Sequence, residues 1–245
     1  MARQKGIVKL DGTLGGVNFY KREGEHLARV SGGGFNSESI KRSALMRGNS
    51  SEMGLASVVN KVFKQSFRSL WLDKNYGSVH YRLQSLFMEI KNLDEVSVFG
   101  KRCVAEGMAT DYGKRLLKDF RFQEGSGVLL SGKLAFDWTT PRMTVSGFDM
   151  ERMELPDGVD LLGVQLLTVC FDFETLDFSF QLSGLLELFR DFGDDHFSLE
   201  TAPLNASDPG VRYAMLRLAH YQQVNGTNYL MRGDAGIRYG FVSVV

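Results

Sequence analysis

The sequence has few prolines and few cysteines, and each shortage excludes a class of protein. Four prolines in 245 residues, beside 27 glycines, argue against a proline-rich linker and favour tight turns between regular elements. The two cysteines, Cys103 and Cys170, lie far apart and outside any C-x-x-C pair. We therefore expect two buried, reduced thiols rather than a disulfide-stapled secreted fold.

Long apolar runs are lacking too. No run of about 18 apolar residues occurs, so the sequence predicts no transmembrane helix. The N-terminus has basic residues but no apolar stretch of signal-peptide length behind them. Hydrophobic residues still make up 43% of the chain, which is typical of globular proteins. We therefore predict a globular cytoplasmic protein with no membrane span, either free or incorporated into a larger particle. Export by a route that leaves no N-terminal mark is the alternative.

Motifs for catalysis or phosphate binding are the third shortage. Neither Gly12–Gly16 nor Gly32–Gly34 has the spacing of a phosphate loop, and no G-x-S-x-G turn occurs. The nearest approach to a metal cluster is Asp194–His196, but adjacent residues of an extended chain point to opposite faces. Arg232–Asp234 matches an adhesion tripeptide, which a hairpin turn explains. We expect no catalytic residue, no metal site and no cofactor, and hence a protein that is not an enzyme.

What the sequence does have is a strong separation of charge. The net charge is zero, yet residues 1–70 hold 12 Lys or Arg against 5 Asp or Glu, and residues 126–245 hold 8 against 16. Such asymmetry favours either a half that faces nucleic acid or a basic surface that meets an acidic one.

Residues 1–34 read as a β arm followed by a glycine hinge. Short strands are predicted at Ile7–Leu10, Val17–Tyr20 and His26–Val30, with turns around Asp11–Gly12 and at Gly24. In the second strand the side chains of residues 17 and 19 share one face, and those of 18 and 20 share the other. A sheet of this size buries too little to be stable alone, so it must dock on its own body or on another chain.

The hinge is the run Gly32–Gly34. Three consecutive glycines would let the arm reorient relative to the rest of the chain. A tight loop with unusual dihedral angles is the alternative.

Residues 35–121 read as a helical segment. A short helix capped at Ser37 or Ser39 is predicted to end at Gly48–Asn49, and a second helix is predicted to begin at Ser50 or Ser51. The apolar face of the second helix has the helical spacing, with the members Leu55, Val58, Val59, Val62, Phe63, Phe67, Leu70 and Trp71.

Two further helices follow in this segment. One is predicted from Val79, Leu83, Leu86, Phe87 and Ile90, and the short connection before it predicts an antiparallel hairpin with the preceding helix. A shorter helix is predicted over residues 111–120, with Leu116, Leu117 and Phe120 facing inward.

Residues 122–245 read as an antiparallel β-sandwich, so the fold class is α+β. Alternating strands are predicted at residues 128–138, 143–148, 161–173, 176–182, 212–224, 227–232 and 237–245. The phase of alternation changes once within residues 161–173, which suggests a bulge. Asn225–Gly226 is a strong hairpin signal. A Greek-key or immunoglobulin-like topology is the expected arrangement.

The two ends of the chain also resemble a known family. Ala2–Gly16, with Phe19–Lys21 and Leu27–Arg29, is similar to the opening of a family of Bacteroidetes proteins that has no established activity. Arg47–Gly54 is similar to a motif in that family's helical segment, and His220–Gly226 with Tyr229 and Leu230 resembles its close. The stretch from about 95 to 210 has no such likeness. The resemblance implies a shared fold and no particular activity.

We therefore predict a structural protein that assembles with itself, head to tail, through its basic N-terminal arm and its acidic C-terminal β-domain. A heterologous contact of this kind generates a ring, a filament or a phage-like particle component. The candidate interface residues are Arg3, Lys5, Lys9, Phe19, Tyr20, Lys21 and Arg22. The alternative is a nucleic-acid-binding module that uses the basic half, with Phe19 and Tyr20 as stacking rings.

Overall fold

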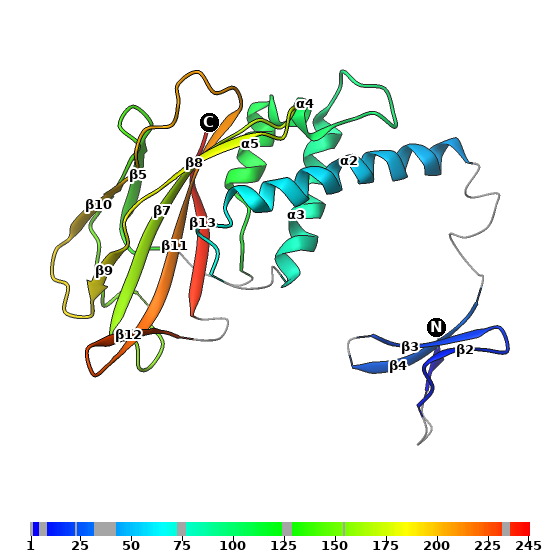
Figure 1. Cartoon of the computed structure of the whole chain (residues 1–245), viewed down its shortest axis with the longest axis horizontal. Helices are drawn as coiled ribbons and strands as arrows, with labels where there is room; N and C mark the ends of the chain where they lie inside the picture. The colour runs from blue at the N-terminus through cyan, green and yellow to red at the C-terminus, as the bar shows by residue number, and fades with distance from the viewer. Residues whose placement is uncertain are drawn as a thin grey trace. The chain divides into compact units, whose positions relative to one another are not determined.

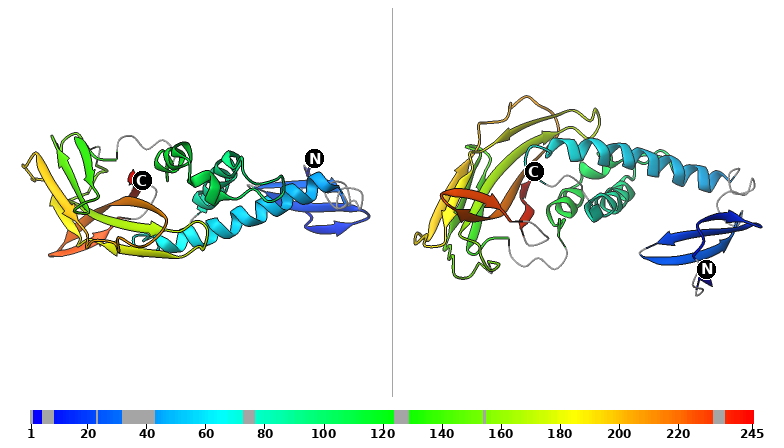
Figure 2. Two further views of the ribbon diagram at one scale, coloured as in Figure 1. Left: turned by 90° about the horizontal axis from the view of Figure 1, so that it is seen from above. Right: turned by 60° about the horizontal axis from the view of Figure 1, so that its bottom comes forward.

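The protein has an α+β fold with an N-terminal β-sheet, a helical segment and a C-terminal antiparallel sandwich (Figures 1 and 2). It is described here from a computed structural model, for residues 2–4, 9–22, 24–31, 43–72, 77–123, 129–153, 155–231 and 236–245. The chain divides into two compact units, Met1–Ser51 and Glu52–Val245, and each unit is considered by itself.

The first unit contains a four-stranded antiparallel sheet in the order β1-β4-β3-β2. Its strands are β1 (Ala2–Arg3), β2 (Gly12–Leu14), β3 (Val17–Arg22) and β4 (Glu25–Val30). The strands predicted from residues 17 and 26, and the turn predicted at Gly24, are confirmed.

The predicted turn at Asp11–Gly12 is wrong. Gly12 begins β2, and the chain reverses instead at Gly15 and Gly16, whose φ angles are +58° and +77°. A two-residue hairpin turn of this type needs two positive φ angles, which two glycines adopt without strain. The described part of the predicted first strand, residues 9 and 10, is outside any strand, and its residues 7 and 8 lie outside the described residues, as does the predicted hinge at Gly32–Gly34.

Helix α2 (Ala44–Ser66) is one continuous helix, so the predicted break at Gly48–Asn49 and the predicted cap at Ser50 or Ser51 are wrong. Neither Gly48 nor Asn49 has the positive φ angle that would end a helix. A helical glycine costs only about 1 kcal/mol, which a helix of this length tolerates. Residues 37–42, where the first helix was expected to begin, lie outside the described residues.

The buried stripe of α2 differs in part from the predicted face. Leu55 and Val58 are exposed, and the stripe instead includes two polar residues, Glu52 and Asn60. Its apolar members are Ala56, Val59 and Phe63, followed beyond the helix by Phe67 and Leu70.

The remaining helices are α3 (Gly77–Ile90), the 3-10 helix η1 (Lys91–Leu93), α4 (Val104–Met108) and α5 (Asp111–Lys118). The predicted apolar face of α3 is confirmed, because all five of its residues are buried. Asn60 bonds Gln84, and Lys64 bonds His80, so residue numbers rise along α2 as they fall along α3. The predicted antiparallel helix pair is therefore confirmed.

Among the described residues of the second unit, nine strands form two antiparallel sheets. The smaller has the order β10-β6-β5, and the larger has the order β12-β11-β7-β8, with β13 beside β11 and β9 beside β7. The strands are β5 (Lys133–Asp137), β6 (Arg142–Ser146), β7 (Leu161–Phe171), β8 (Phe178–Leu182), β9 (Leu186–Phe189), β10 (His196–Glu200), β11 (Val211–Val224), β12 (Thr227–Leu230) and β13 (Ile237–Val244).

The connectivity is that of a Greek-key sandwich. Strands β8 and β9 lie end to end along one side of β7, and β12 and β13 lie end to end along one side of β11. When each of these pairs is counted as one position in its sheet, called a lane here, the nine strands occupy seven lanes. Lettered A to G in chain order, the lanes form sheets A-B-E and D-C-F-G. This differs from the constant-type immunoglobulin arrangement only in that lane D belongs to the other sheet.

The larger sheet lies between the helices and the smaller sheet (Figure 1). Strand β7 contributes Leu167, Val169 and Phe171 to the core on the helical side, and Leu162 and Val164 to the core on the other side. The bulge predicted in this strand is wrong, because residues 161–171 pair with β11 without interruption. The apparent change of phase arises because the strand is buried on both faces.

Candidate assembly interface

The N-terminal sheet has one apolar face and one basic face. Strand pairing places Leu14 opposite Val17, Val17 opposite Val30 and Phe19 opposite Ala28, so these five side chains share a face. The opposite face holds the side chains of Arg3, Tyr20, Arg22 and Arg29.

Contacts on the basic face hold several of these cations in place. The Arg29 guanidinium lies 5.5 Å from the centre of the Tyr20 ring, and Arg3 pairs with Glu25 at 3.1 Å. Because both partners of this ion pair are exposed, it contributes little to stability.

The side chain of Gln4 fastens residues 9 and 10 to the sheet. Its Oε1 accepts a hydrogen bond from the backbone N–H of Leu10 at 2.9 Å, and its Nε2 donates to the carbonyl of Leu27 at 3.0 Å. Lys9 Nζ donates to the carbonyl of Gln4 at 2.5 Å. Hydrogen bonds rather than burial therefore hold residues 9 and 10, which precede β2, against the sheet.

The apolar face is open to solvent in part, because Val17, Phe19 and Ala28 are half-buried whereas Leu14 and Val30 are exposed. Leu14 is 69% exposed and Val30 is 74% exposed, and none of the described side chains of the unit Met1–Ser51 is buried. The unit therefore has a sheet with a hydrophobic face but no core of its own.

The predicted interface residues are distributed over both faces. Phe19 and Lys21 lie on the apolar side of β3, while Tyr20 and Arg22 lie on the basic side with Arg3. Lys9 precedes β2, and Lys5 lies outside the described residues. The sequence missed Leu14 and Val30, although alternation along each strand places both on the face of Phe19 once the hairpin turn is known.

The charge separation follows the division into units. Residues 1–51 carry nine Lys or Arg and four Asp or Glu, whereas residues 52–245 carry 20 and 25. In the second unit, acidic side chains gather on loops at the ends of the sandwich, including Asp149, Glu151, Asp157, Asp191, Asp194 and Asp195.

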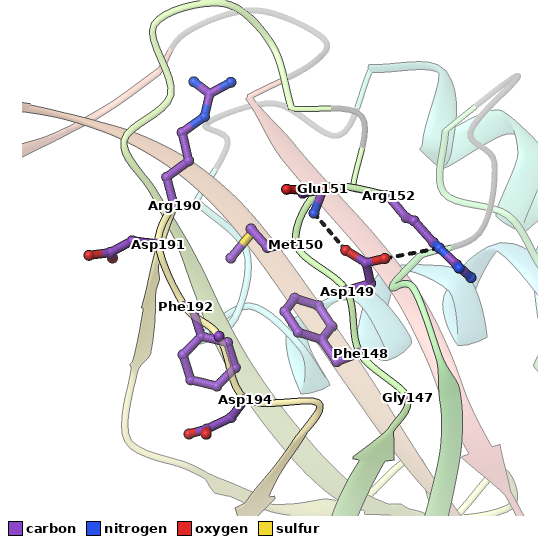
Figure 3. Close-up of a pocket in the computed structure, with 11 residues that line it drawn as sticks. Gly147, Phe148, Asp149, Met150, Glu151, Arg152, Arg190, Asp191, Phe192 and Asp194 are labelled. Atoms are coloured by element: carbon purple, nitrogen blue, oxygen red, sulfur yellow. Dashed lines mark hydrogen bonds and ion pairs between the residues drawn. The ribbon is translucent and has the colours of Figure 1, made fainter.

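A pocket of about 650 Å³ opens among these acidic loops (Figure 3). It is lined by residues 147–152 and 190–194, which include no serine, threonine, cysteine, histidine or lysine. Asp149 is already paired with Arg152 at 3.0 Å and accepts a hydrogen bond from the N–H of Glu151. Figure 3 shows the rings of Phe148 and Phe192 lying together at its wall, where they join the sandwich core. Its charged side chains are four carboxylates and two guanidinium groups, so the lining of the pocket has a net negative charge.

Two buried carboxyl groups of the second unit, those of Glu52 and Asp94, have pKa values far below the usual range because hydrogen bonds within the fold stabilise their ionised forms. Glu52 is fully buried, and its carboxylate accepts hydrogen bonds from Arg102, Lys91 and the N–H of Gly100. Chiefly because of Arg102, these donors lower the pKa of Glu52 to about 2. Burial alone would raise the pKa of Asp94, but backbone N–H groups such as those of Ser97 and Cys103 outweigh it and lower this pKa to about 2 as well.

The other residues singled out in the sequence lie in different places in the structure. His196 and Asp195 are both exposed and contact each other at 3.0 Å, and the described residues contain no cluster of three metal-binding side chains. Cys103 and Cys170 are both free thiols; Cys170 is buried, whereas Cys103 is only half-buried. The tripeptide Arg232–Asp234 lies outside the described residues. Within the described ranges, no helix is both long enough and apolar enough to cross a membrane.

Comparison with known proteins adds no identity. No family model, curated protein or solved structure matches the chain. The resemblance of its two ends to a Bacteroidetes family therefore stays a prediction.

Proposed function

We propose that the protein is a non-enzymatic structural component that assembles with itself, using its N-terminal sheet as a docking module. The observation that carries this proposal is a four-stranded sheet with a partly exposed apolar face and no buried side chain among its described residues. A sheet becomes stable when its hydrophobic face is covered, and each Å² of apolar surface removed from water stabilises by roughly 25 cal/mol.

Charge favours a second copy of the chain as the partner that covers this face. The first unit has an excess of five positive charges, and the second has an equal excess of negative charges. Opposite charges on the two surfaces speed association and favour a head-to-tail arrangement over a symmetric one.

The test is the molar mass of the purified full chain across a range of protein and salt concentrations, by analytical ultracentrifugation. We expect the mass to rise with concentration and to fall at high salt, because exposed charges are screened. A variant lacking residues 1–34 should remain monomeric and folded, since the second unit has its own core. A full chain that is monomeric under all conditions would overturn the proposal.

A charge-reversal pair provides a matched control. Lys21→Glu, in the N-terminal sheet, should weaken association about twofold to fivefold, as expected for one exposed charge. Lys61→Glu, on the exposed side of α2 in the second unit, should leave association unchanged. The ratio of absorbance at 260 and 280 nm of the purified protein distinguishes self-assembly from the nucleic-acid-binding alternative, because co-purifying nucleic acid would raise this ratio.

A further inference from the structure

Among the described residues, another part of the chain bonds to the backbone of one edge of the larger sheet but not to that of the other edge. On the β13 side, Gln123 Nε2 donates to the carbonyl of Ile237 at 3.2 Å, and Gln123 Oε1 accepts from the N–H of Tyr239 at 3.3 Å. Arg121 forms a β-bridge with Gly240 beside them. The chain's own residues 121–123 thus occupy backbone groups of that edge between residues 237 and 240.

On the β8 side, the described residues provide no such cover. Within the described part of the chain, β8 and β9 pair with β7 alone, and they lie between residues 178 and 189. The N–H of Asp172 bonds the carbonyl of Asp177, and the N–H of Ser183 bonds the carbonyl of Leu166. Because hydrogen-bonding direction alternates along a strand, the backbone groups of Phe178, Phe180 and Leu182 point away from β7.

Large apolar side chains follow this open edge. Phe180 is 43% exposed and Leu182 is 37% exposed, and Leu185 and Phe189 are exposed to a similar degree. The edge is flanked by the carboxylates of Asp177 before β8 and Asp191 after β9. A long apolar edge with unpaired backbone groups is a template for a further strand.

We propose, building on the self-assembly above, that the β8–β9 edge of one copy is the acceptor for the N-terminal sheet of another. The donor is the β2–β3 side of that sheet, where β2 is a three-residue outer strand with the exposed side chain of Leu14. Main-chain hydrogen bonds extend the larger sheet, and apolar side chains on both sheets leave water. Lys9 and Lys21 bring positive charge to an edge that carries negative charge.

Photo-crosslinking in the full chain tests the location of this contact. A benzoyl-phenylalanine replaces Phe180, and equal amounts of 14N- and 15N-labelled protein are mixed under conditions in which the full chain associates. We expect the dominant crosslink between copies to join residue 180 to the tryptic peptide 10–21, which contains β2 and most of β3. The same analogue at Tyr229, on β12 at the other side of the sheet, should give little or none of this product.

Other outcomes of the crosslinking overturn the inference while leaving self-assembly intact. A crosslink from residue 180 to the same edge of the partner would show edge-to-edge pairing, and an associated protein with no crosslink at residue 180 would place the acceptor elsewhere. A full chain that stays monomeric would instead overturn both proposals.

Substitution gives a second readout. Phe180→Lys places a charge at the edge and should raise the concentration needed for half-association at least tenfold, whereas Tyr229→Lys should not. The thermal midpoint of each variant monomer shows whether it has folded. Should Phe180→Lys fold poorly, Leu182→Lys takes its place. Unchanged association in a folded edge variant would overturn the inference.

Discussion

At the scale of single residues, the buried ionic group around Glu52 connects three segments of the second unit. Glu52 belongs to α2, Lys91 to η1 after α3, and Arg102 to the loop before α4. The carboxylate also fixes the backbone of Gly100 in that loop, next to the exposed ring of Phe99, over which the Arg102 guanidinium lies at 5.6 Å. One carboxylate thus determines how the loop is held against two helices.

Glu52→Gln is therefore expected to destabilise the protein by about 3 kcal/mol at neutral pH, because it leaves the buried Lys91 without a charged partner. Glu89→Gln, at an exposed position of α3, should change the free energy of unfolding by less than about 0.5 kcal/mol. Urea denaturation of the two variants and the parent measures both effects.

The effect of Glu52→Gln should also depend on pH. The pKa of Glu52 is about 2 in the folded protein and 4.5 when unperturbed, so its ionised form stabilises the fold fully above pH 4.5. This contribution is lost as the pH falls towards 2. The stability difference between parent and variant should thus be smaller at pH 3 than at pH 7. Equal differences at the two values would contradict the assignment.

At the scale of elements, two helical glycines illustrate opposite constraints. A Cβ atom on Gly107 in α4 would lie 2.0 Å from the backbone carbonyl oxygen of Ile90, so α4 contacts the end of α3 directly through its backbone. A Cβ atom on Gly54 in α2 would meet nothing within 4 Å. Only the first position needs a glycine.

Gly107→Ala should therefore destabilise the protein by about 2 kcal/mol or more, because α4 must move away from Ile90. Gly54→Ala should instead stabilise it by about 1 kcal/mol, since alanine favours the helical backbone. Thermal unfolding of the two variants checks both signs in one experiment. A stabilised Gly107→Ala would show that α4 can shift at little cost.

Elements with one buried face could be predicted from the sequence, and elements defined by long-range contacts could not. The spacing of Leu83, Phe87 and Ile90 predicted α3 because a single face packs on the core. Strand β7 gave a misleading signal because both of its faces are buried, and its polar residues Gln165 and Thr168 lie on opposite faces and so mark no phase. The continuation of α2 through Gly48–Asn49 was missed because local propensity favours an end there.

The candidate interface could likewise be predicted only in part, because some of its residues come together only through pairing between strands. Basic residues and the rings of Phe19 and Tyr20 can be read directly from the sequence of the arm. The apolar face depends on pairing between strands, because Leu14 and Val30 come together only through Val17. The β8–β9 edge was not predicted at all, since an edge is defined by which strands fail to pair beside it.

At the scale of the whole molecule, the predicted segments and the compact units differ in one respect. The helices α3, α4 and α5 share a continuous core with β7, β11 and β13, so residues 52–121 of the predicted helical segment lie in one unit with the predicted sandwich. The four-stranded N-terminal sheet lies in the other unit, which has a positive net charge and no buried side chain among its described residues. The second unit thus contains the buried core, whereas the described side chains of the first unit are all exposed or half-buried.

The hydrogen bonds of Gln123 to β13 also affect how many neighbouring copies one molecule can bind through its larger sheet. Because residues 237–240 of β13 are bonded by the chain itself, the proposed contact gives each copy one acceptor, the β8–β9 edge of the larger sheet, and one donor, the N-terminal sheet. A bivalent, directional subunit grows as an unbranched polymer with two distinct ends, or closes on itself once the rotation per step permits. Branching would require a second acceptor for the N-terminal sheet in the same copy.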